Sequence, residues 1–412
     1  MNSAVAFIGM TSSQLKIQCK GVIMENKEYQ RKLKGDQPVL AICYDFDKTL
    51  TPDDMQAQGF IQSVEYDISE FWKKSNGLAE SNDMDQNLAY MYTMIDASEG
   101  HFVFNREKLA EYGSKVQLFP GVKDWFTRIR EYGKSYGVIV EHYIISSGLK
   151  EMIEGTSVAK SGAFEKIYAS SFYYNDKGVA KWPAQVINYT NKTQFLFRIE
   201  KGVLDINDQG VNESFAPEDV RVPFRNMVYI GDSDTDIPCM KLVNSYGGYS
   251  IGVYNHRTED KTKVYKMMHD NRIKYYAASD YSENSELDKL VKLIIKRTAA
   301  NENIEDFHYS CKKENIEADT KNSEEKRKKT SLLISLDNSG NFKTTHAIVK
   351  NLSQVGTWDT NEKETLFEIA LDNSQVFSLL GDHDVKSFFR SLLQGMSGLS
   401  ENAKKVKAQI DK

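Results

Sequence analysis

The stretch VLAICYDFDKTLT, residues 39–51, decides the fold of this chain. Its first six residues are continuously apolar, which is typical of a strand buried on both faces of a parallel sheet. Asp45 and Asp47 follow directly and, being two residues apart, share a face, so both carboxyl groups can point into one pocket. In open α/β sheets the ligand pocket lies beyond the carboxyl ends of the strands, where this pair stands. The alternative is a surface loop that holds two aspartates by chance.

More strands and helices alternate after this stretch. Apolar runs predict strands at 138–145, 166–170, 227–230 and 249–254, and helical spacing predicts helices between them, for instance at 122–132 and 193–201. Strands that alternate with helices predict an α/β fold with a doubly wound parallel sheet. Within residues 52–117, stretches such as 60–72 and 84–95 show helical periodicity, which indicates a helical insertion directly after the first strand.

The chain has 412 residues, which favours two or three domains. Residues 312–329 are nearly all charged or polar, which is typical of an exposed linker. After them, apolar residues again recur at helical spacing. The charged end, 400–412, is expected to fray. Met24 is an alternative start. We predict an N-terminal extension (1–37), a catalytic core (38–51 and 118–298), a helical cap (52–117), a charged linker (299–330) and a small C-terminal helical domain (331–412).

Polar residues that could bind a ligand or take part in catalysis stand at three further ends of predicted strands or helices. Ser146, in the run IISSG (144–148), and the amides after it can bind a phosphoryl oxygen. Lys192 opens a predicted helix, and helix N-termini attract anions. The run GDSDTD (231–236) again places carboxylates after a strand. Each motif is weak alone, but all four ends meet at one edge of one sheet, so their carboxylates need a cation. Oxygen ligands without histidine favour Mg²⁺.

The order DFDKTLT, IISSG, Lys192, GDSDTD resembles the haloacid dehalogenase-like (HAD) hydrolase superfamily. It looks most similar to the phosphoserine phosphatase-like branch with a helical C1-type cap. The resemblance implies that Asp45 is the nucleophile that forms an aspartyl-phosphate. It implies that Asp47 first protonates the leaving oxygen and then activates water. Ser146 and Lys192 would hold the phosphoryl oxygens, with Lys181 as the competing third-motif lysine.

The resemblance also implies a metal site and substrate contacts. Mg²⁺ would be held by the carboxylate of Asp45, the backbone carbonyl of Asp47 and the carboxylates of Asp232 and Asp236, with Asp234 as the weaker alternative to Asp236. Ser147 and Gly148 would assist in substrate binding, and Ser147 competes with Ser146. Asp54 stands where related phosphatases contact a substrate ammonium, although it would serve equally well as a helix N-cap.

The predicted function is therefore a Mg²⁺-dependent phosphomonoester hydrolase, a phosphatase that acts on a small phosphorylated metabolite. The alternative is a regulatory protein with a HAD core whose residues 331–412 recruit a partner or form a homo-oligomer. The net charge of −5 argues against a nucleic-acid coat, and no run reaches the length of a membrane span. The four cysteines are widely spaced and form no metal-binding pair, which favours a reduced, cytoplasmic setting.

Overall fold

The computed structural model describes residues 29–215, 219–319, 324–394, 396 and 398–411. Most of the predicted N-terminal extension, with Met24, lies outside the described residues. Within the described part of the chain, no helix is both long and apolar enough to cross a bilayer.

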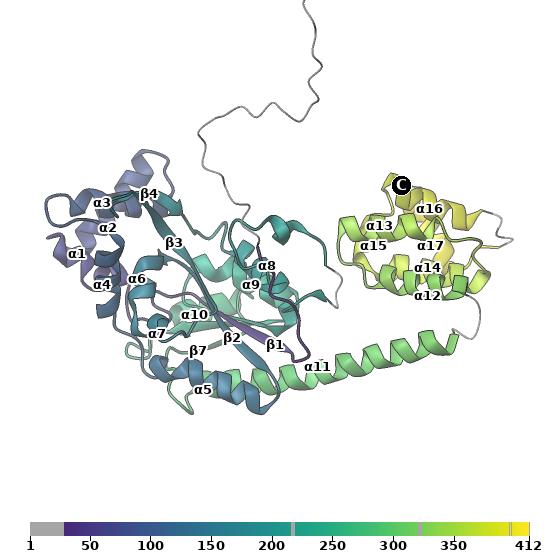
Figure 1. The fold of residues 1–412 in the computed structure, drawn as a ribbon, viewed down its shortest axis with the longest axis horizontal. Helices are drawn as coiled ribbons and strands as arrows, with labels where there is room; N and C mark the ends of the chain where they lie inside the picture. Colours follow the sequence, from purple (N-terminus) through teal and green to yellow (C-terminus); the bar gives the residue numbers. More distant parts are fainter. Residues whose placement is uncertain (1–28, 216–218, 320–323, 395, 397, 412) are drawn as a thin grey trace, which may run out of the picture. The chain divides into compact units, whose positions relative to one another are not determined.

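The predicted α/β fold with a doubly wound sheet is confirmed (Figure 1). Seven strands follow the order β4-β3-β2-β1-β5-β6-β7, and every neighbouring pair is parallel except β3 and β4. The sequence did not predict β4, which contains Pro183 and lies at the sheet edge where proline is tolerated, nor the four-residue β7. The strands are β1 (Val39–Tyr44), β2 (Ile139–Leu149), β3 (Lys166–Tyr174), β4 (Ala180–Gln185), β5 (Met227–Gly231), β6 (Tyr249–Tyr254) and β7 (Tyr275–Ala278).

Helices cover both faces of this sheet. Alternate residues of β1 enter two different hydrophobic cores, with Leu40 and Ile42 in one and Ala41 and Cys43 in the other. The first core is closed by α5 and α11, and the second by α8, α9 and α10. These helices are α5 (Val122–Ser135), α8 (Thr193–Lys201), α9 (Ile237–Ser245), α10 (Thr262–His269) and α11 (Glu286–Asp319); the core also contains α6 (Lys150–Gly155), α7 (Ser157–Lys160) and the short turns η2 (Gln209–Asn212), η4 (Phe224–Asn226) and η5 (Asp234–Asp236).

The register of the central strands brings the motifs to one edge. Tyr44, the last residue of β1, lies beside Ile144 of β2 and beside Ile230 of β5. The residues that follow these three positions are therefore neighbours at the carboxyl end of the sheet, although they are about 100 to 185 residues apart in the chain. This placement is the one expected for a ligand site in an open α/β sheet.

The insertion after β1 is helical and packs on the core. Phe60 is fully buried and meets Phe71, Phe102, Phe104 and Tyr112 edge to face, with ring centroids 5.7–6.3 Å apart. Edge-to-face contacts of this kind add to the stability that area burial provides. Buried cap aromatics such as Phe60 and Phe71 therefore serve as packing, in a hydrophobic core that the cap shares with the sheet. The elements are η1 (Met55–Ala57), α1 (Phe60–Ser63), α2 (Ile68–Ser81), α3 (Gln86–Ser98) and α4 (Arg106–Lys115).

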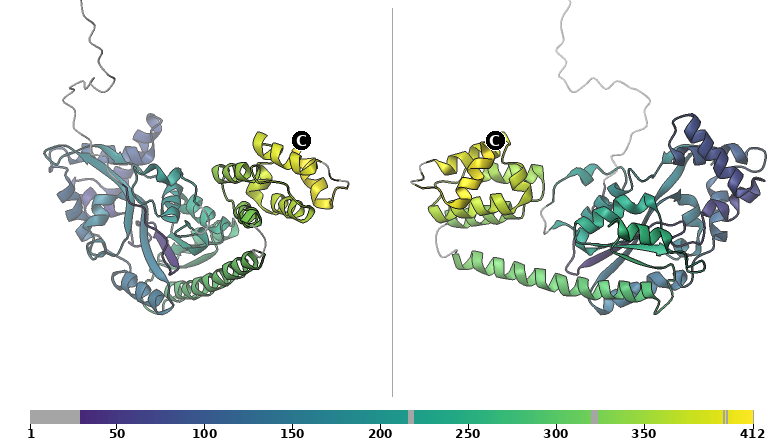
Figure 2. Two further views of the ribbon diagram at one scale, coloured as in Figure 1. Left: turned by 45° about the vertical axis from the view of Figure 1, so that its right-hand side comes forward. Right: turned by 180° about the vertical axis from the view of Figure 1, so that it is seen from behind.

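The C-terminal helices pack together as a bundle (Figure 2). Their hydrophobic core includes fully buried side chains such as Leu366 and Phe389. The expectation that 400–412 frays is wrong, because α17 buries Val406 and Ile410 in this core. Much of the segment 299–330, predicted as a linker, is helical, since α11 continues to Asp319 and α12 begins at Glu324. The helices are α12 (Glu324–Asp337), α13 (Phe342–Leu352), α14 (Thr360–Asp372), α15 (Ser374–Ser378), α16 (His383–Leu393) and α17 (Glu401–Ile410).

Candidate active site

Asp45 is held in place by the sheet itself. Its backbone N–H donates to the carbonyl oxygen of Ile230 at 2.9 Å, which extends the β1–β5 ladder by one residue. The side chain is almost completely buried and faces the site. Lys48, three residues later, adopts a left-handed backbone with φ 57°, so the chain turns sharply away from the sheet here. Asp45 thus stands on a rigid strand end rather than on a loose loop.

Lys192, at the N-terminus of α8, is fully buried and points at this aspartate. Its Nζ lies 3.0 Å from Oδ1 of Asp45 and 2.8 Å from Oδ1 of Asp236. Burial opposes the lysine charge, but the two carboxylates outweigh that effect and hold the pKa of Lys192 above its usual value. Lys181, the competing lysine, is exposed on β4. The geometry therefore places Lys192 in the site.

Three carboxylates converge beside the lysine. Asp45, Asp232 and Asp236 each offer an oxygen, and these oxygens all lie within 4.8 Å of one another. Burial, together with the neighbouring carboxylates, raises the pKa of Asp45 to about 7 against the opposing effect of Lys192, and that of Asp232 to about 6. Asp234 is exposed and stands outside the cluster.

This donor set fits a hard divalent cation. The cluster offers carboxylate oxygens without nitrogen or sulfur, which is the chemistry that Mg²⁺ prefers. A bound cation would also relieve the repulsion that raises the pKa of Asp45 and Asp232. The side chain of Asp47 is not a member of the cluster, and the contribution of its backbone carbonyl stays a prediction.

Asp47 is half-buried near Asp45 and is held by the start of the cap. Its Oδ1 accepts a hydrogen bond from the backbone N–H of Met55 at 2.7 Å. Burial first, and then the negative charges of Asp54 and Asp45, raise the pKa of Asp47 well above its usual value. A raised pKa favours the protonated form of the carboxyl group, which is the form that a general acid needs.

The end of β2 lies against Asp47. Oγ of Ser146 accepts from the N–H of Gly148 at 3.0 Å, and a Cβ placed on Gly148 would stand 2.7 Å from Oδ2 of Asp47 and 3.3 Å from Oγ of Ser146. Ser146 and Asp47 are therefore close neighbours. Oγ of Ser147 is buried and, among the described residues, has no hydrogen-bond partner. A buried hydroxyl without a protein partner keeps its capacity to form a hydrogen bond with a ligand.

Residues 42–241 match the family model of the haloacid dehalogenase-like hydrolases. The chain carries a HAD hydrolase domain. An uncharacterized protein of Borreliella burgdorferi is 26% identical over 275 residues, which cover 60% of this chain and 94% of that protein. The family match over residues 42–241 supports a hydrolase enzyme.

Solved structures of HAD proteins are similar at low identity. A HAD family hydrolase from Salmonella enterica serovar Typhi is 16% identical, with a TM-score of 0.42 over 63% of this chain and 73% of that chain. A probable phosphoserine phosphatase from Vibrio cholerae is 11% identical, with a TM-score of 0.42 over 65% of this chain and 67% of that chain. At these values the likeness does not extend to a substrate, so the substrate stays a prediction.

Asp54 of the HAD domain is already paired. Its Oδ2 lies 2.7 Å from Nζ of Lys48, and its side chain makes no capping hydrogen bond to η1. A cationic group of a substrate would have to displace Lys48 to reach this carboxylate. The N-cap alternative has no hydrogen bond to support it either, so the role of Asp54 stays a prediction.

The sequence analysis did not predict two residues that contact the site. Tyr229 donates to Oδ1 of Asp236 at 2.9 Å, and Tyr90 of the cap donates to the carbonyl oxygen of Ser147 at 2.7 Å. Tyr229 stands two residues before Gly231 on β5, so its position before the acidic loop was the available signal. Tyr90 carries no such signal in the sequence, because only the fold decides which aromatic side chain of the cap reaches the loops that bear the motifs.

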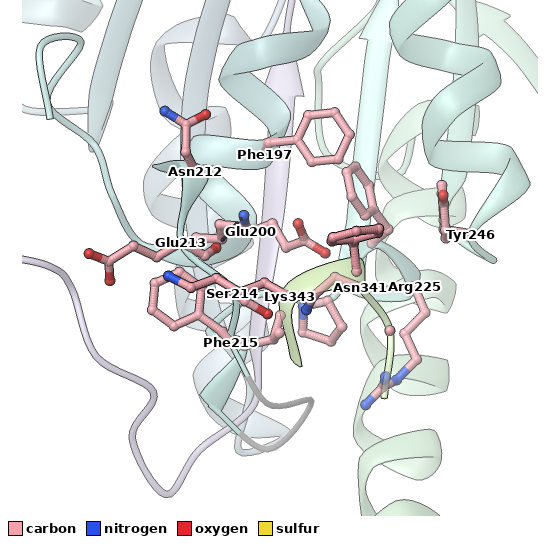
Figure 3. A pocket seen from close by; sticks show the side chains of 16 residues that line it. Phe197, Glu200, Asn212, Glu213, Ser214, Phe215, Arg225, Tyr246, Asn341 and Lys343 are labelled. Carbon is pink, nitrogen blue, oxygen red and sulfur yellow. Dashed lines mark hydrogen bonds between the residues drawn. The ribbon is translucent and has the colours of Figure 1, made fainter. Parts of the chain in front are cut away.

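The catalytic domain also carries an aromatic surface patch away from the four motifs. It includes Phe197, Glu200, Phe224, Arg225 and Tyr246 (Figure 3). The ring of Phe224 meets Phe197 edge to face at 5.4 Å and stacks on Tyr246 at 5.3 Å. None of these residues belongs to the four motifs, so this patch is separate from the predicted catalytic groups.

Proposed function

We propose that the HAD domain is a Mg²⁺-dependent phosphatase that hydrolyses a small phosphomonoester through an aspartyl-phosphate. The observation that supports this most is the juxtaposition of Asp45, Lys192 and the carboxylates of Asp232 and Asp236 at one strand edge. It combines a nucleophile, a fixed positive charge and a cation site, which are the parts that phosphoryl transfer needs.

In the first step, a carboxylate oxygen of Asp45 attacks phosphorus and the bond from phosphorus to the leaving oxygen breaks. Asp47 donates its proton to that oxygen, so the leaving group departs as a neutral alcohol. In the second step, Asp47 takes a proton from water, whose oxygen attacks phosphorus. The aspartyl–phosphate bond then breaks, which releases inorganic phosphate and restores the Asp45 carboxylate.

The remaining residues bind and orient. Lys192 faces Asp45, where it offsets the negative charge that otherwise repels a phosphate group. Ser146 and Ser147 offer hydroxyl groups to the phosphoryl oxygens, and the unpartnered Oγ of Ser147 supports that role. A magnesium ion held by Asp45, Asp232, Asp236 and the Asp47 carbonyl would supply charge neutralisation and orientation of the phosphoryl group.

The cap bears on the size of the substrate. It stands directly after the nucleophile and shares a hydrophobic core with the sheet. A helical cap over the site excludes water and bulky groups, which favours a small metabolite over a folded protein substrate. The reduced cysteines Cys43, Cys239 and Cys311 are in keeping with a cytoplasmic reaction.

The test is hydrolysis of p-nitrophenyl phosphate with purified full-length protein. We expect Mg²⁺-dependent release of p-nitrophenol that EDTA abolishes and that Asp45→Asn removes. Asp234→Asn is the matched control, because Asp234 is exposed and outside the cluster. Activity that persists in EDTA, or in Asp45→Asn, would contradict the proposed mechanism. A screen of phosphorylated metabolites would then identify the substrate.

A further inference from the structure

The start of the cap helix α3 contacts the loop that leads to the catalytic lysine. Oδ2 of Asp85, the N-cap residue of α3, accepts a hydrogen bond from Nδ2 of Asn188 at 2.7 Å. Two residues further, Nδ2 of Asn87 donates to the carbonyl oxygen of Ile187 at 2.8 Å. Two nearby side chains of the cap thus bind two neighbouring residues of the core, which are about 100 positions away in the chain.

Asn188 is in turn the fixed point of the short loop before Lys192. Its carbonyl oxygen accepts from the N–H of Lys192 at 3.1 Å. Its Oδ1 accepts from the N–H of Thr190 at 2.9 Å, and its own N–H donates to Oδ1 of Asn191 at 2.9 Å. Asx turns of this kind fix the backbone locally. A shift of Asn188 is therefore transmitted to the backbone from which Lys192 projects.

A third contact joins the same helix to the second motif. The hydroxyl of Tyr90 donates to the carbonyl oxygen of Ser147 at 2.7 Å, and Oγ of Ser170 donates to the same carbonyl at 3.0 Å. Ser170 also accepts from the N–H of Ile187 at 3.0 Å. The two loops that bear the motifs are thus connected to each other and, through α3, to the cap.

We propose that Asp85 and Asn188 are positioning residues that couple the cap to Lys192, so that the lysine reaches its catalytic place only when α3 rests on the core. The inference rests on the proposed phosphatase function. Lys192 is fully buried, and its Nζ lies within 3.0 Å of both of its carboxylate partners. A small shift of its backbone therefore disturbs the two contacts that Nζ makes with these carboxylates. Misplacement of a catalytic group by about 1 Å can lower a rate about 100-fold.

A reciprocal exchange tests the pair. Asn188→Asp keeps the acceptor for Thr190 but places a second carboxylate against Asp85, at a separation of 2.7 Å in the native pair. Asp85→Asn keeps the N-cap acceptor for Asn87 and Leu88 but sets one amide nitrogen against another. The double variant Asp85→Asn/Asn188→Asp restores a donor opposite an acceptor and keeps the native net charge.

We expect each single variant to lower kcat for p-nitrophenyl phosphate about tenfold at saturating Mg²⁺, with KM within about twofold of native. The double variant should recover kcat to within about threefold. Asn82→Asp is the control, because it adds the same charge to the cap where the amide bonds only to the carbonyl of Leu78 in its own helix. Its kcat should equal that of the native enzyme.

Three results would overturn the inference. Single variants with native kcat, or with changes confined to thermal stability, would show that the pair is only structural. A double variant no more active than the singles would show that the two residues are not coupled. A rise in KM at native kcat would show that α3 acts on substrate binding instead. Native protein that hydrolyses no phosphomonoester would refute the proposed function itself, and that result is visible before any variant is made.

Discussion

Gly148 gives the sharpest test of the active-site geometry. An added Cβ would lie 2.7 Å from Oδ2 of Asp47 and 2.5 Å from Cε of Met55, whereas ordinary van der Waals contact begins near 3.4 Å. Met55 can swing its terminal methyl away. Asp47 has less freedom, because its Oδ1 is bound to the N–H of Met55 at 2.7 Å. Gly148→Ala therefore displaces the Asp47 carboxyl by about 0.7 Å, the difference between 3.4 Å and 2.7 Å.

Displacement on this scale should lower kcat about 10- to 100-fold. Since Asp47 protonates the leaving oxygen, the loss should be greater for phenyl phosphate, whose leaving group needs the proton, than for p-nitrophenyl phosphate, whose leaving group departs readily as an anion. The assay compares kcat for both esters in native protein and in Gly148→Ala. The fold itself should tolerate the change, because the backbone of Gly148 is not in the left-handed region.

Gly77→Ala supplies the matched control, because a Cβ at this helical position of the cap meets no atom within 4 Å. It should leave kcat unchanged and raise stability by up to about 1 kcal/mol, since alanine favours a helix over glycine. Native kcat in Gly148→Ala, or an equal loss for both esters, would refute the assignment of Asp47 as the general acid that Gly148 packs against.

Three further predictions concern stability, the metal site and the C-terminal core. Burial alone would raise the pKa of Glu141, but hydrogen bonds from Arg221, Lys32 and Tyr143 outweigh it and lower the pKa to about 2 from a usual value near 4.5. A carboxyl group with a lowered pKa stabilises the fold above about pH 4.5, and this stabilisation is lost as the pH falls towards 2. Glu141→Gln should therefore lower the free energy of unfolding, measured with urea, by up to about 3 kcal/mol at pH 7 and by much less at pH 3. A loss of stability that does not change with pH would contradict this. Tyr229→Phe removes one of the hydrogen-bond donors to the carboxylate of Asp236. In a Mg²⁺ titration of activity, the activation constant for Mg²⁺ should rise about tenfold, with little change in kcat at saturating metal. An unchanged activation constant would argue against this hydrogen bond as a support of the metal site. Phe389→Ala should destabilise the C-terminal core by about 3–5 kcal/mol yet leave kcat unchanged at low temperature, because that core shares no residue with the two around the sheet; a matching loss of kcat would show that the catalytic domain depends on it.

Much of the site follows from local sequence. A buried strand needs only its own apolar residues to be identified, and Asp45 and Asp232 each follow such a strand directly, while Ser146 lies near the end of another. A parallel sheet then brings those ends to one edge. For this reason the convergence of Asp45, Ser146 and Asp232 could be predicted before any contact was known, whereas the role of Asp45 as nucleophile is implied by the resemblance to the HAD superfamily.

Other choices depend on the order of the strands and the packing of the cap. Lys181 and Lys192 are both plausible third-motif lysines from sequence, and only the fold shows one on an exposed edge strand and the other buried against Asp45. Asp54 offered two roles from sequence, and its pairing with Lys48 depends on the left-handed turn at Lys48. Such choices rest on side-chain geometry that no spacing rule encodes.

The sequence by itself determined five of the seven strands, the four motifs and the chemical types of the groups at the strand ends, because strand burial and side-chain alternation are local properties. The tertiary structure alone decided that Tyr90, Asp85 and Asn188 join the cap to the motif loops, because the pairs they form lie about 60 to 100 residues apart. Contacts over such separations exist only once the nonlocal sheet order β3-β2-β1-β5 has formed. The identity of the reacting groups is thus a property of short segments, and their alignment is a property of the whole domain.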